Sequence, residues 1–561
     1  MKRWIALLAA ACMMLTACAA IPTSGDVRVS ERVSRESGGV ILDPKGPSPD
    51  LTPEQLVDGF LQASSAGFGD AFSTARQYLT PEAAAHWDPS AQVQVYPDSA
   101  STSLSRGADG ALRVSVAVTG SVDVDGNYST APDDSVFSSE FTLVRDSDDQ
   151  WRIAVLRDGI IMPETLFSSL FVRSRLYFLN PTNTGLVPDV RWFPRSNALM
   201  LMVQGVIDGP SRWLTVAAHS AIPPETRLEV GEVVMDDGVA RIEMGASLAT
   251  LTNAQLQLFE EQLRNTITGS GLAQDIVLLA DGAAVGSGRQ LQLPAYPFPA
   301  ASLVAVRDGQ YTAYDDGSPR NIGFADQILN YDLDTFAVGY SDSARSLVAV
   351  NGGRNVMYHV DFETAEVREL LRAEGLVTPS VDQFGWAWSA NSSSDGRLLI
   401  ANTRNGTQGE LYSEQIQGQH ISALAVSRDG TRIALAYDEP GSESVAVFAI
   451  QRGVDGVPMA LGDAFNIGQC MAGVRDLAWT GDARLVALGA QGDEAAGSEL
   501  YQLDLGGPVD EIPAVSNAIA VTAGRGSDSI VLMTQAGSLY RYTSGVWSRF
   551  ASDISAMALP G

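Results

Sequence analysis

Cys18 is the residue whose position most clearly implies chemistry. It directly follows small residues at the end of an apolar run of twelve residues, 4–15, which the basic residues Lys2 and Arg3 precede. A basic start, a short apolar run and small residues are typical of a secretory signal. Because a helix needs about 20 apolar residues to cross a hydrocarbon core, we expect residues 1–17 to direct export and then to be removed. The thiol of Cys18 would then stand on the first residue of the mature chain.

The four residues Leu15, Thr16, Ala17 and Cys18 resemble the bacterial lipobox. The resemblance implies an S-diacylglycerol thioether on Cys18 and an N-acyl chain, such as palmitate, on its amine. One acyl chain binds a membrane only marginally, whereas two or three chains form a durable anchor. A secreted protein that carries a cysteine here by chance stays the alternative.

Other nucleophilic or metal-binding chemistry has little support in the sequence. Cys12 leaves with the signal, so Cys470 is the one further thiol of the mature chain, and we interpret it as a small buried hydrophobe. The four histidines lie far apart and lack the spacing of a metal pair: His86, His219, His359 and His420. The chain has no HExxH, GxSxG or Walker motif. We therefore expect no catalytic, cofactor-binding or metal-binding site.

Several turns rich in polar and acidic residues allow calcium as an alternative. Residues 391–396 have the outline of a cation loop, but Asn402 stands where an EF-hand has its bidentate glutamate. Residues 123–127 and 428–431 carry the Asp-Gly signature of hairpin turns, which is the interpretation we favour.

Length and charge limit the classes of partner. The chain has 561 residues, of which 45% are hydrophobic, so it can form several packed domains. Its 37 basic and 66 acidic residues give a formal charge of −29, which repels nucleic acid and anionic lipid alike. A lipid anchor would hold such a body at a membrane that its charge disfavours.

The first half of the mature chain predicts a tether and two α+β domains. Residues 18–50 contain four prolines and no hydrophobic period, which indicates a flexible tether. Thr52 and Thr80 each precede a proline, the start signal of a helix, and a further helical stretch covers residues 72–78. Alternating strands follow at 112–118, 140–145 and 151–156. Helices followed by strands in this order make residues 51–165 resemble the NTF2-like cone.

The second α+β domain is expected over residues 171–294. A helix from Ala198, a turn at Gly209, a strand over 221–226 and then a long helix resemble the GerMN domain. The long helix begins after Thr252 and presents an apolar face of residues three or four apart: Leu256, Phe259, Leu263 and Ile267. Residues 276–279 predict a buried strand behind it.

Residues 300–561 repeat themselves and predict an all-β propeller. A core triplet centred on alanine recurs at spacings of 50, 38, 53 and 42 residues, its central positions being Ala337, Ala387, Ala425, Ala478 and Ala520. A four-stranded blade takes about 40–45 residues. The segment 554–559 echoes 421–426, while the unit at 302–316 lacks an inner strand, so pairing the two would close the ring. We expect six blades, with five or seven left open.

A lipobox, an NTF2-like cone, a GerMN-like domain and a terminal propeller, in this order, resemble the LpqB lipoprotein family of actinobacteria. The resemblance implies a place on the outer face of the cell membrane. It also implies contact with the extracellular sensor domain of a histidine kinase, MtrB, in two-component signalling, envelope homeostasis and cell division. The protein would then be a binding module and not an enzyme.

The alternative is a propeller that binds or cleaves cell-envelope glycan. Trp386, Trp388 and Trp479 could form a sugar platform, but packing between blades explains their repeat positions more simply. Acidic residues in the axial channel could act as acid and base, although the sequence does not place two carboxylates at the required separation. Ligand capture by the GerMN-like domain stays a third option.

Overall fold

A computed structural model describes most of the chain from residue 45 onward. The described residues are 45–560 except 108–109, 133, 224–225, 227, 229, 287–290, 299–301, 316, 323–330, 341–344, 440–441, 472 and 491–497. The signal, Cys18 and nearly all of the expected tether lie outside the described residues. Their assignments therefore stay predictions.

Threonine caps begin the first helices of the N-terminal domain, as predicted. Helix α2 (Pro53–Ser65) starts after Thr52, whose side chain accepts a hydrogen bond from the backbone N–H of Gln55, and the Gln55 side chain returns to the Thr52 backbone. Thr80 caps α4 (Pro81–His86) through its side chain, which accepts the backbone N–H of Ala83. The helix predicted over 72–78 is only the four-residue α3 (Ser73–Arg76). It begins only at Ser73 because Phe72 adopts a left-handed backbone conformation, which the helix cannot include.

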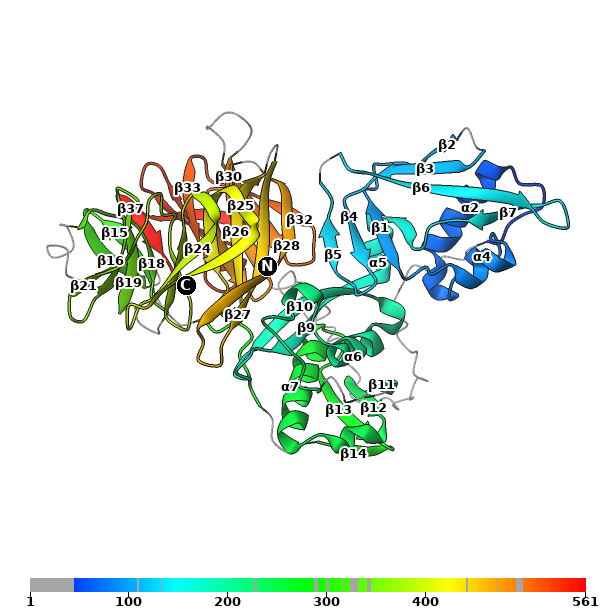
Figure 1. Ribbon diagram of the computed structural model, residues 1–561, viewed down its shortest axis with the longest axis horizontal. Coiled ribbons are helices and arrows are strands. Elements are labelled where there is room, and N and C mark those ends of the chain that lie inside the picture. Colours follow the sequence, from blue (N-terminus) through cyan, green and yellow to red (C-terminus); the bar gives the residue numbers. More distant parts are fainter. Residues whose placement is uncertain are drawn as a thin grey trace, which may run out of the picture. The chain divides into compact units, whose positions relative to one another are not determined.

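Two four-stranded sheets and α2 enclose the core of this domain (Figure 1). The first sheet has the order β5 (Tyr128–Thr130), β4 (Gly120–Asp123), β1 (Gln92–Tyr96), β8 (Ile160–Pro163). The second has the order β2 (Ser103–Arg106), β3 (Leu112–Ala117), β6 (Val136–Arg145), β7 (Trp151–Val155). Helix α2 buries Leu56, Val57 and Phe60 against these strands. A helix packed inside sheets agrees with the expected cone.

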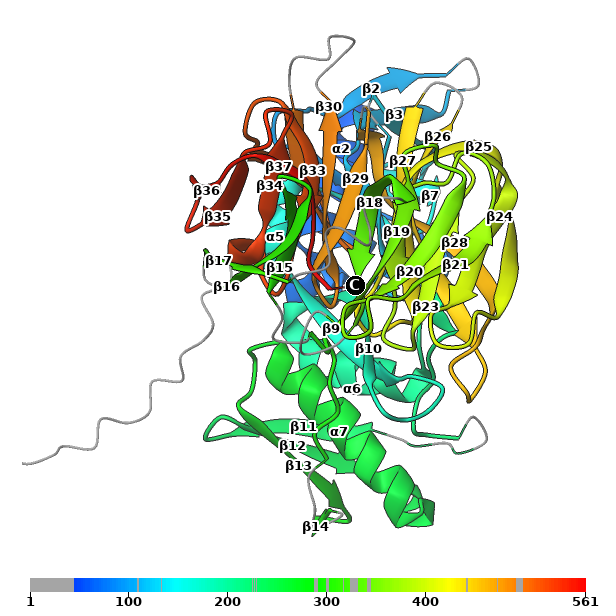
Figure 2. The ribbon, with the colours of Figure 1, turned by 90° about the vertical axis from the view of Figure 1, so that its left-hand side faces the viewer.

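The next region begins with a hairpin and contains the predicted long helix. Helix α5 (Glu164–Leu170) leads into the paired strands β9 (Phe171–Leu179) and β10 (Leu186–Pro194). Helix α6 (Ala198–Asp208) follows, and α7 (Asn253–Gly269) lies along a four-stranded sheet (Figure 2). The strands of that sheet are, in order, β11 (Val230–Asp236), β12 (Val239–Met244), β13 (Asp275–Ala280) and β14 (Ala283–Val285).

The predicted apolar face of α7 is confirmed, whereas the prediction of a strand over 221–226 is not. Thr252 caps α7, whose residues Leu256, Phe259, Leu263 and Ile267 are all buried. The buried strand predicted over 276–279 is β13, which pairs parallel with β12. The strand predicted over 221–226 is wrong for its described residues, which form bends and irregular backbone. Consecutive prolines explain this, since proline lacks the N–H that a ladder needs.

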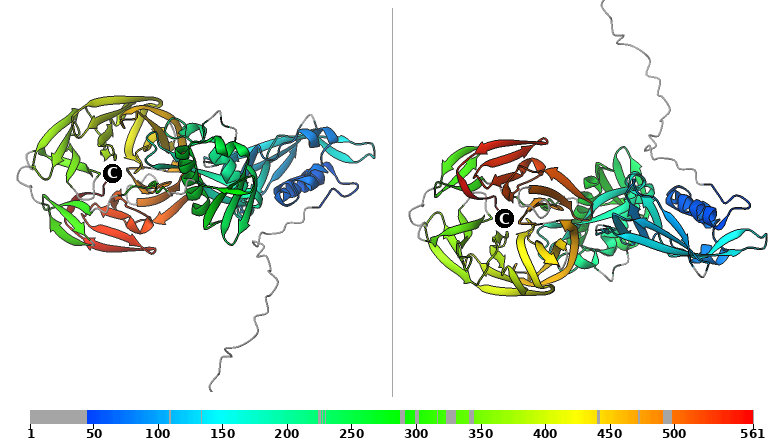
Figure 3. Two further views of the ribbon diagram at one scale, coloured as in Figure 1. Left: turned by 90° about the horizontal axis from the view of Figure 1, so that it is seen from below. Right: turned by 90° about the horizontal axis from the view of Figure 1, so that it is seen from above.

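The remaining described residues form six four-stranded blades arranged in a ring, with the C-terminal end near its centre (Figure 3). The first strands of the blades are β37, β18, β22, β25, β29 and β33, and consecutive ones contact each other around the ring. The single long strand β25 is the outer strand of one blade and the first strand of the next. This gives the six blades expected from the repeats.

The strands of each blade follow in sheet order. The first three blades are β37 (Ile554–Ala558), β15 (Leu303–Arg307), β16 (Gln310–Asp315), β17 (Ser318–Asn321); β18 (Leu333–Val338), β19 (Ser346–Asn351), β20 (Val356–Asp361), β21 (Val367–Arg372); and β22 (Ser380–Val381), β23 (Trp386–Ala390), β24 (Ser393–Asn402), β25 (Gln408–Val426). The others are β25 again with β26 (Arg432–Glu439), β27 (Ser442–Arg452), β28 (Pro458–Met471); β29 (Asp476–Gly481), β30 (Arg484–Ala490), β31 (Ser498–Asp504), β32 (Val509–Pro513); and β33 (Ala518–Thr522), β34 (Val531–Thr534), β35 (Leu539–Thr543), β36 (Val546–Ala551).

The last strand closes the ring, as predicted. Strand β37 pairs antiparallel with β15, with Ala558 opposite Val304 and Ala556 opposite Val306. The first blade therefore combines one strand from the chain's end with three from the start of the propeller. This pairing covers an edge that would otherwise offer unpaired backbone groups to other chains.

The prediction for one repeat is wrong: its core triplet was expected on the first strand of a blade and lies on the second. Trp386, Ala387 and Trp388 lie on β23, the second strand of their blade, and the short β22 precedes them as the first strand. The cause is Asp382, whose carboxylate accepts the backbone N–H of Trp386 and the indole N–H of Trp388, both at 2.9 Å. These bonds fold a turn immediately before the tryptophans. Trp386, Trp388 and Trp479 are all buried, so they form no exposed sugar platform.

Candidate binding sites

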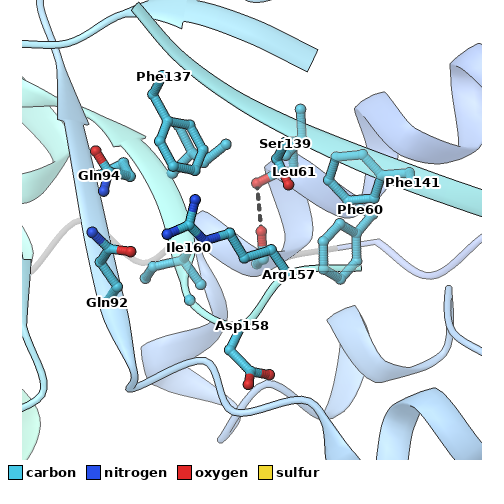
Figure 4. A pocket seen from close by; sticks show the side chains of 13 residues that line it. Phe60, Leu61, Gln92, Gln94, Phe137, Ser139, Phe141, Arg157, Asp158 and Ile160 are labelled. Atoms are coloured by element: carbon cyan, nitrogen blue, oxygen red, sulfur yellow. Dashed lines mark hydrogen bonds between the residues drawn. The ribbon is translucent and has the colours of Figure 1, made fainter. Parts of the chain in front are cut away.

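The N-terminal domain has a small aromatic pocket beside α2 (Figure 4). Phe60 comes from α2, while Phe137, Ser139 and Phe141 alternate along β6 and so share one face of that strand. Phe60 and Phe141 pack edge to face, with centroids 6.0 Å apart. Side chains fill most of the space, and the remaining volume of about 20 Å³ has room for about one water molecule.

Polar side chains form the opposite wall of this pocket. Gln92 and Gln94 alternate along β1, and Gln94 is only 7% exposed. Figure 4 shows the guanidinium of Arg157 on their side of the pocket, and it lies 5.5 Å from the ring centroid of Phe137. Asp158 accepts a hydrogen bond from the backbone N–H of Asp88 at 2.9 Å. The pocket thus offers amides and a cation to a small polar group, but no pair of free carboxylates.

A much larger cavity, about 560 Å³, lies between two blades of the propeller. Its floor is one face of the blade β18–β21, and its wall consists of the turns after β22 and after β24 in the next blade. Strand register places the floor residues in two rows across three strands: Ser346, Asp361 and Glu366 in one, and Val348, His359 and Arg368 in the other. A volume of this size is typical of small-molecule sites.

The polar groups of this interblade cavity divide into anchored and available ones. Asp382 is fully engaged, because its carboxylate also accepts a hydrogen bond from Arg452 at 2.5 Å and both side chains are buried. Asp361 accepts the backbone N–H groups of Glu363 and Thr364 at 2.8 and 2.9 Å. These hydrogen bonds outweigh desolvation and lower the pKa of Asp361. The carboxylate of Asp382 is therefore occupied within the fold, and that of Asp361 is stabilised as an anion by its backbone donors.

Two further side chains of the interblade cavity are uncharged at pH 7. Burial lowers the pKa of His359, and the nearby Arg368 adds to this effect, so the imidazole is neutral at pH 7. The hydroxyl of Tyr340 is buried and has no hydrogen-bond partner among the described residues, and desolvation raises its pKa. Both groups line the interblade cavity.

The structure separates the histidines that the sequence singled out. The imidazole of His86 donates a hydrogen bond to the backbone carbonyl oxygen of Glu82 on its own helix, at 2.9 Å. Nε2 of His219 lies 3.0 Å from Oδ1 of Asn183, and His420 is on β25. His359 alone of the four lines one of these two sites. Among the described residues, no three His, Cys, Asp or Glu side chains are placed to hold a metal ion.

The polar turns serve as hairpin connections where they are described. Asp123 accepts the backbone N–H of Asp125 and of Asn127, which shapes the turn between β4 and β5. Asp429 does the same for Thr431 between β25 and β26. Asn391 accepts the N–H of Ser393 at the start of β24. Their side-chain oxygens therefore satisfy backbone donors, as hairpin turns require.

Sequence reasoning missed Tyr340, Arg368 and Arg404 of the interblade cavity. The alternation of charged residues along 359–368 was a local signal for one exposed strand face. It did not reveal which turns of the next blade face that hairpin.

No helix in the described part of the chain is long and apolar enough to span a membrane.

Comparison with known proteins identifies each region. Residues 46–168 match the family model "Lipoprotein LpqB, N-terminal domain", residues 324–560 match "Lipoprotein LpqB beta-propeller domain", and residues 175–286 match the Germane model, described as "Sporulation and spore germination". Among solved structures, this chain resembles in part a chain of the nidogen/laminin complex (9% identity, 46% of this chain and 97% of that one, TM-score 0.35). It also resembles TolB from Acinetobacter baumannii (12% identity, 46% and 66% covered, TM-score 0.34).

Relatives match along almost the whole chain. "Lipoprotein LpqB" of Streptomyces avermitilis is 25% identical and covers 98% of this chain and 96% of its own length. The protein of the same name in Cutibacterium acnes is 23% identical, with 99% and 98% covered, and that of Bifidobacterium longum is 26% identical, with 85% and 83% covered. Two LpqB domain models and relatives matched nearly end to end lead to one conclusion: the chain belongs to the LpqB lipoprotein family.

Proposed function

We propose that the protein is an extracytoplasmic lipoprotein that binds and modulates the extracellular sensor domain of a histidine kinase of the MtrB kind. The observation that carries the proposal is the near full-length match to proteins named Lipoprotein LpqB. The geometry of the interblade cavity supports a binding role, because the buried carboxylate of Asp382 is paired with Arg452 and engaged within the fold.

The anchor part of the proposal assigns lipidation to Cys18. A diacylglyceryl thioether and an N-palmitoyl chain would hold the protein on the outer face of the cell membrane despite its formal charge of −29. Cells fed a radioactive fatty acid should label the wild type but not Cys18→Ala. Cys470→Ala is the matched control, since it removes the other thiol of the mature chain and should keep the label. Label on Cys18→Ala would contradict the assignment.

The regulatory part of the proposal rests on unequal binding. A partner shifts a two-state sensor only if it binds one state more tightly than the other. The purified protein should therefore bind the isolated sensor domain in calorimetry and change the autophosphorylation rate of the full-length kinase in proteoliposomes. Absence of binding would reject the kinase partner. Turnover of peptidoglycan fragments that one carboxylate substitution abolishes would instead favour the glycan-active alternative.

A further inference from the structure

The floor of the interblade cavity separates positive from negative charge. Strands β20 and β21 form a hairpin in which His359 faces Arg368, while Asp361 and Glu366 follow two residues further towards the turn. Residues two apart share a face, and the distance along the strand is about 7 Å. One end of the floor therefore carries carboxylates, and the backbone of Arg368 lies about 7 Å away along the strand.

The acidic end has more negative charge than its ion pairs neutralise. Glu363 pairs with Arg345 at 3.5 Å. The carboxylates of Asp361 and Glu366 have no ion pair within the described residues, and Glu366 is exposed. An ammonium group at this end would complete the charge balance.

The basic end is built by both blades. Arg368 donates a hydrogen bond to the carbonyl oxygen of Thr403 in the next blade, which fixes its guanidinium beside the turn after β24. Arg404, on the same turn, is exposed and has no ion pair within the described residues. Two guanidinium groups at one turn form a receptor for a carboxylate, which arginine binds through paired N–H groups.

The floor also carries one neutral hydrogen-bonding side chain. The His359 imidazole is half-buried and lies in the basic row, directly opposite Arg368. An imidazole offers both a donor and an acceptor to a polar group of a ligand that lies along the floor.

We propose that the interblade cavity binds a short zwitterionic peptide, its ammonium group at Asp361 and Glu366 and its carboxylate at Arg368 and Arg404. The cavity of about 560 Å³ accommodates such a molecule, and two residues of strand separate the acidic row from the basic row, which suits a dipeptide better than a single amino acid. His359 binds the peptide amide. The proposal does not depend on the kinase as partner, so the two stand or fall separately.

Three probes test the two charged ends separately. Full-length protein in detergent is titrated calorimetrically with L-alanyl-L-alanine, with its N-acetyl derivative and with its C-terminal amide. We expect the free dipeptide to bind and each blocked form to bind about tenfold to a hundredfold more weakly, as charged hydrogen bonds predict. Absence of binding by the free dipeptide at millimolar concentration would overturn the proposal, as would equal binding of all three.

Variants then assign each end to its residues. Glu366→Gln should lower the affinity for the free dipeptide to that for the N-acetyl form. The free dipeptide should still bind more tightly than its C-terminal amide. Arg404→Gln should give the reverse pattern. Both residues are exposed, so the fold should survive. Glu511→Gln and Arg549→Gln change the same charges at exposed positions on β32 and β36, outside the cavity, and should leave binding unchanged. A loss of affinity that does not depend on the blocked end would contradict the assignment.

Discussion

The pocket beside α2 and the interblade cavity show two ways in which a β-rich domain treats its interior. In the N-terminal domain, the side chains of Phe60, Phe137 and Phe141 fill the space between helix and sheet, and a cavity of about 20 Å³ remains. In the propeller, two blades are held apart by their places in a closed ring, and about 560 Å³ stays open and charged. A helix can pack closely against a sheet until aromatic side chains fill the space between them. In a propeller, the closed ring sets the distance between neighbouring blades. Recognition of a ligand is therefore expected in the propeller.

Removal of residues 554–561 should have the largest effect. The first blade would lose β37, and with it the cover over Val304 and Ala305 of β15. We expect the propeller to lose its cooperative unfolding transition in calorimetry, while the N-terminal domain keeps its own, because the core of that domain contains no propeller residue. An unchanged propeller transition would show that the ring does not depend on its last strand.

Substitution of Asp382 should destabilise the propeller next most strongly. Asp382→Ala leaves the buried guanidinium of Arg452 without its carboxylate, for which we expect a loss of about 3–5 kcal/mol in the free energy of unfolding. Asp395→Ala is the matched control, since it removes an exposed ion pair with Arg397 and should cost at most about 1 kcal/mol. Denaturant unfolding measures both. Equal losses would contradict the buried role of Asp382.

Phe60→Ala tests the filled pocket of the N-terminal domain. Phe60 is buried against Trp87 and Phe141, with ring centroids 5.2 and 6.0 Å away, so its truncation should cost about 3–5 kcal/mol. The transition of the N-terminal domain should shift, and that of the propeller should not. A variant that also gains affinity for benzene in solution would confirm that the aromatic ring fills the pocket. A shift confined to the propeller would contradict the separation of the two cores.

Asp476 should produce a smaller effect that depends on pH. Desolvation raises its pKa to about 7, although the backbone N–H groups of Val521 and Leu477 oppose this. A carboxyl group with a raised pKa in the folded state stabilises the fold fully below its ordinary pKa and loses this contribution as the pH rises to 7. The propeller should therefore unfold at a higher temperature at pH 5 than at pH 8. Asp476→Asn should reduce this difference, whereas the exposed Asp510→Asn should not.

Local signals in the sequence correctly predicted the starts of three helices and the closure of the ring. Three predicted helix starts are confirmed by threonine caps, at Thr52, Thr80 and Thr252. They could be predicted because a cap and its helix are neighbours in the chain. The similarity of 554–559 to 421–426 revealed β37 as a first strand without a blade of its own. These features depend on residues that are close together or alike.

Two errors were local, the extent of the helix over 72–78 and the strand over 221–226, and the others concern relations between distant strands. The triplet at Ala387 was read as a first strand, yet Val381 holds that position and lies 44 residues from both Ala337 and Ala425. A two-residue strand has too little pattern to be recognised alone. The sequence did not predict the interblade cavity, because His359 and Arg404 belong to different blades and line one cavity only when the ring has formed. Their charges have no order along the chain that would reveal this.

Crosslinking in living cells tests the central claim, that a lipid-anchored propeller protein works by binding a kinase sensor domain outside the cytoplasm. Cells carrying an affinity-tagged copy are treated with a crosslinker that does not cross the membrane, and the captured proteins are identified by mass spectrometry. We predict that the sensor kinase is enriched with the wild type and lost with Cys18→Ala. Capture without the kinase, or a tagged protein that the reagent does not reach in intact cells, would contradict the account.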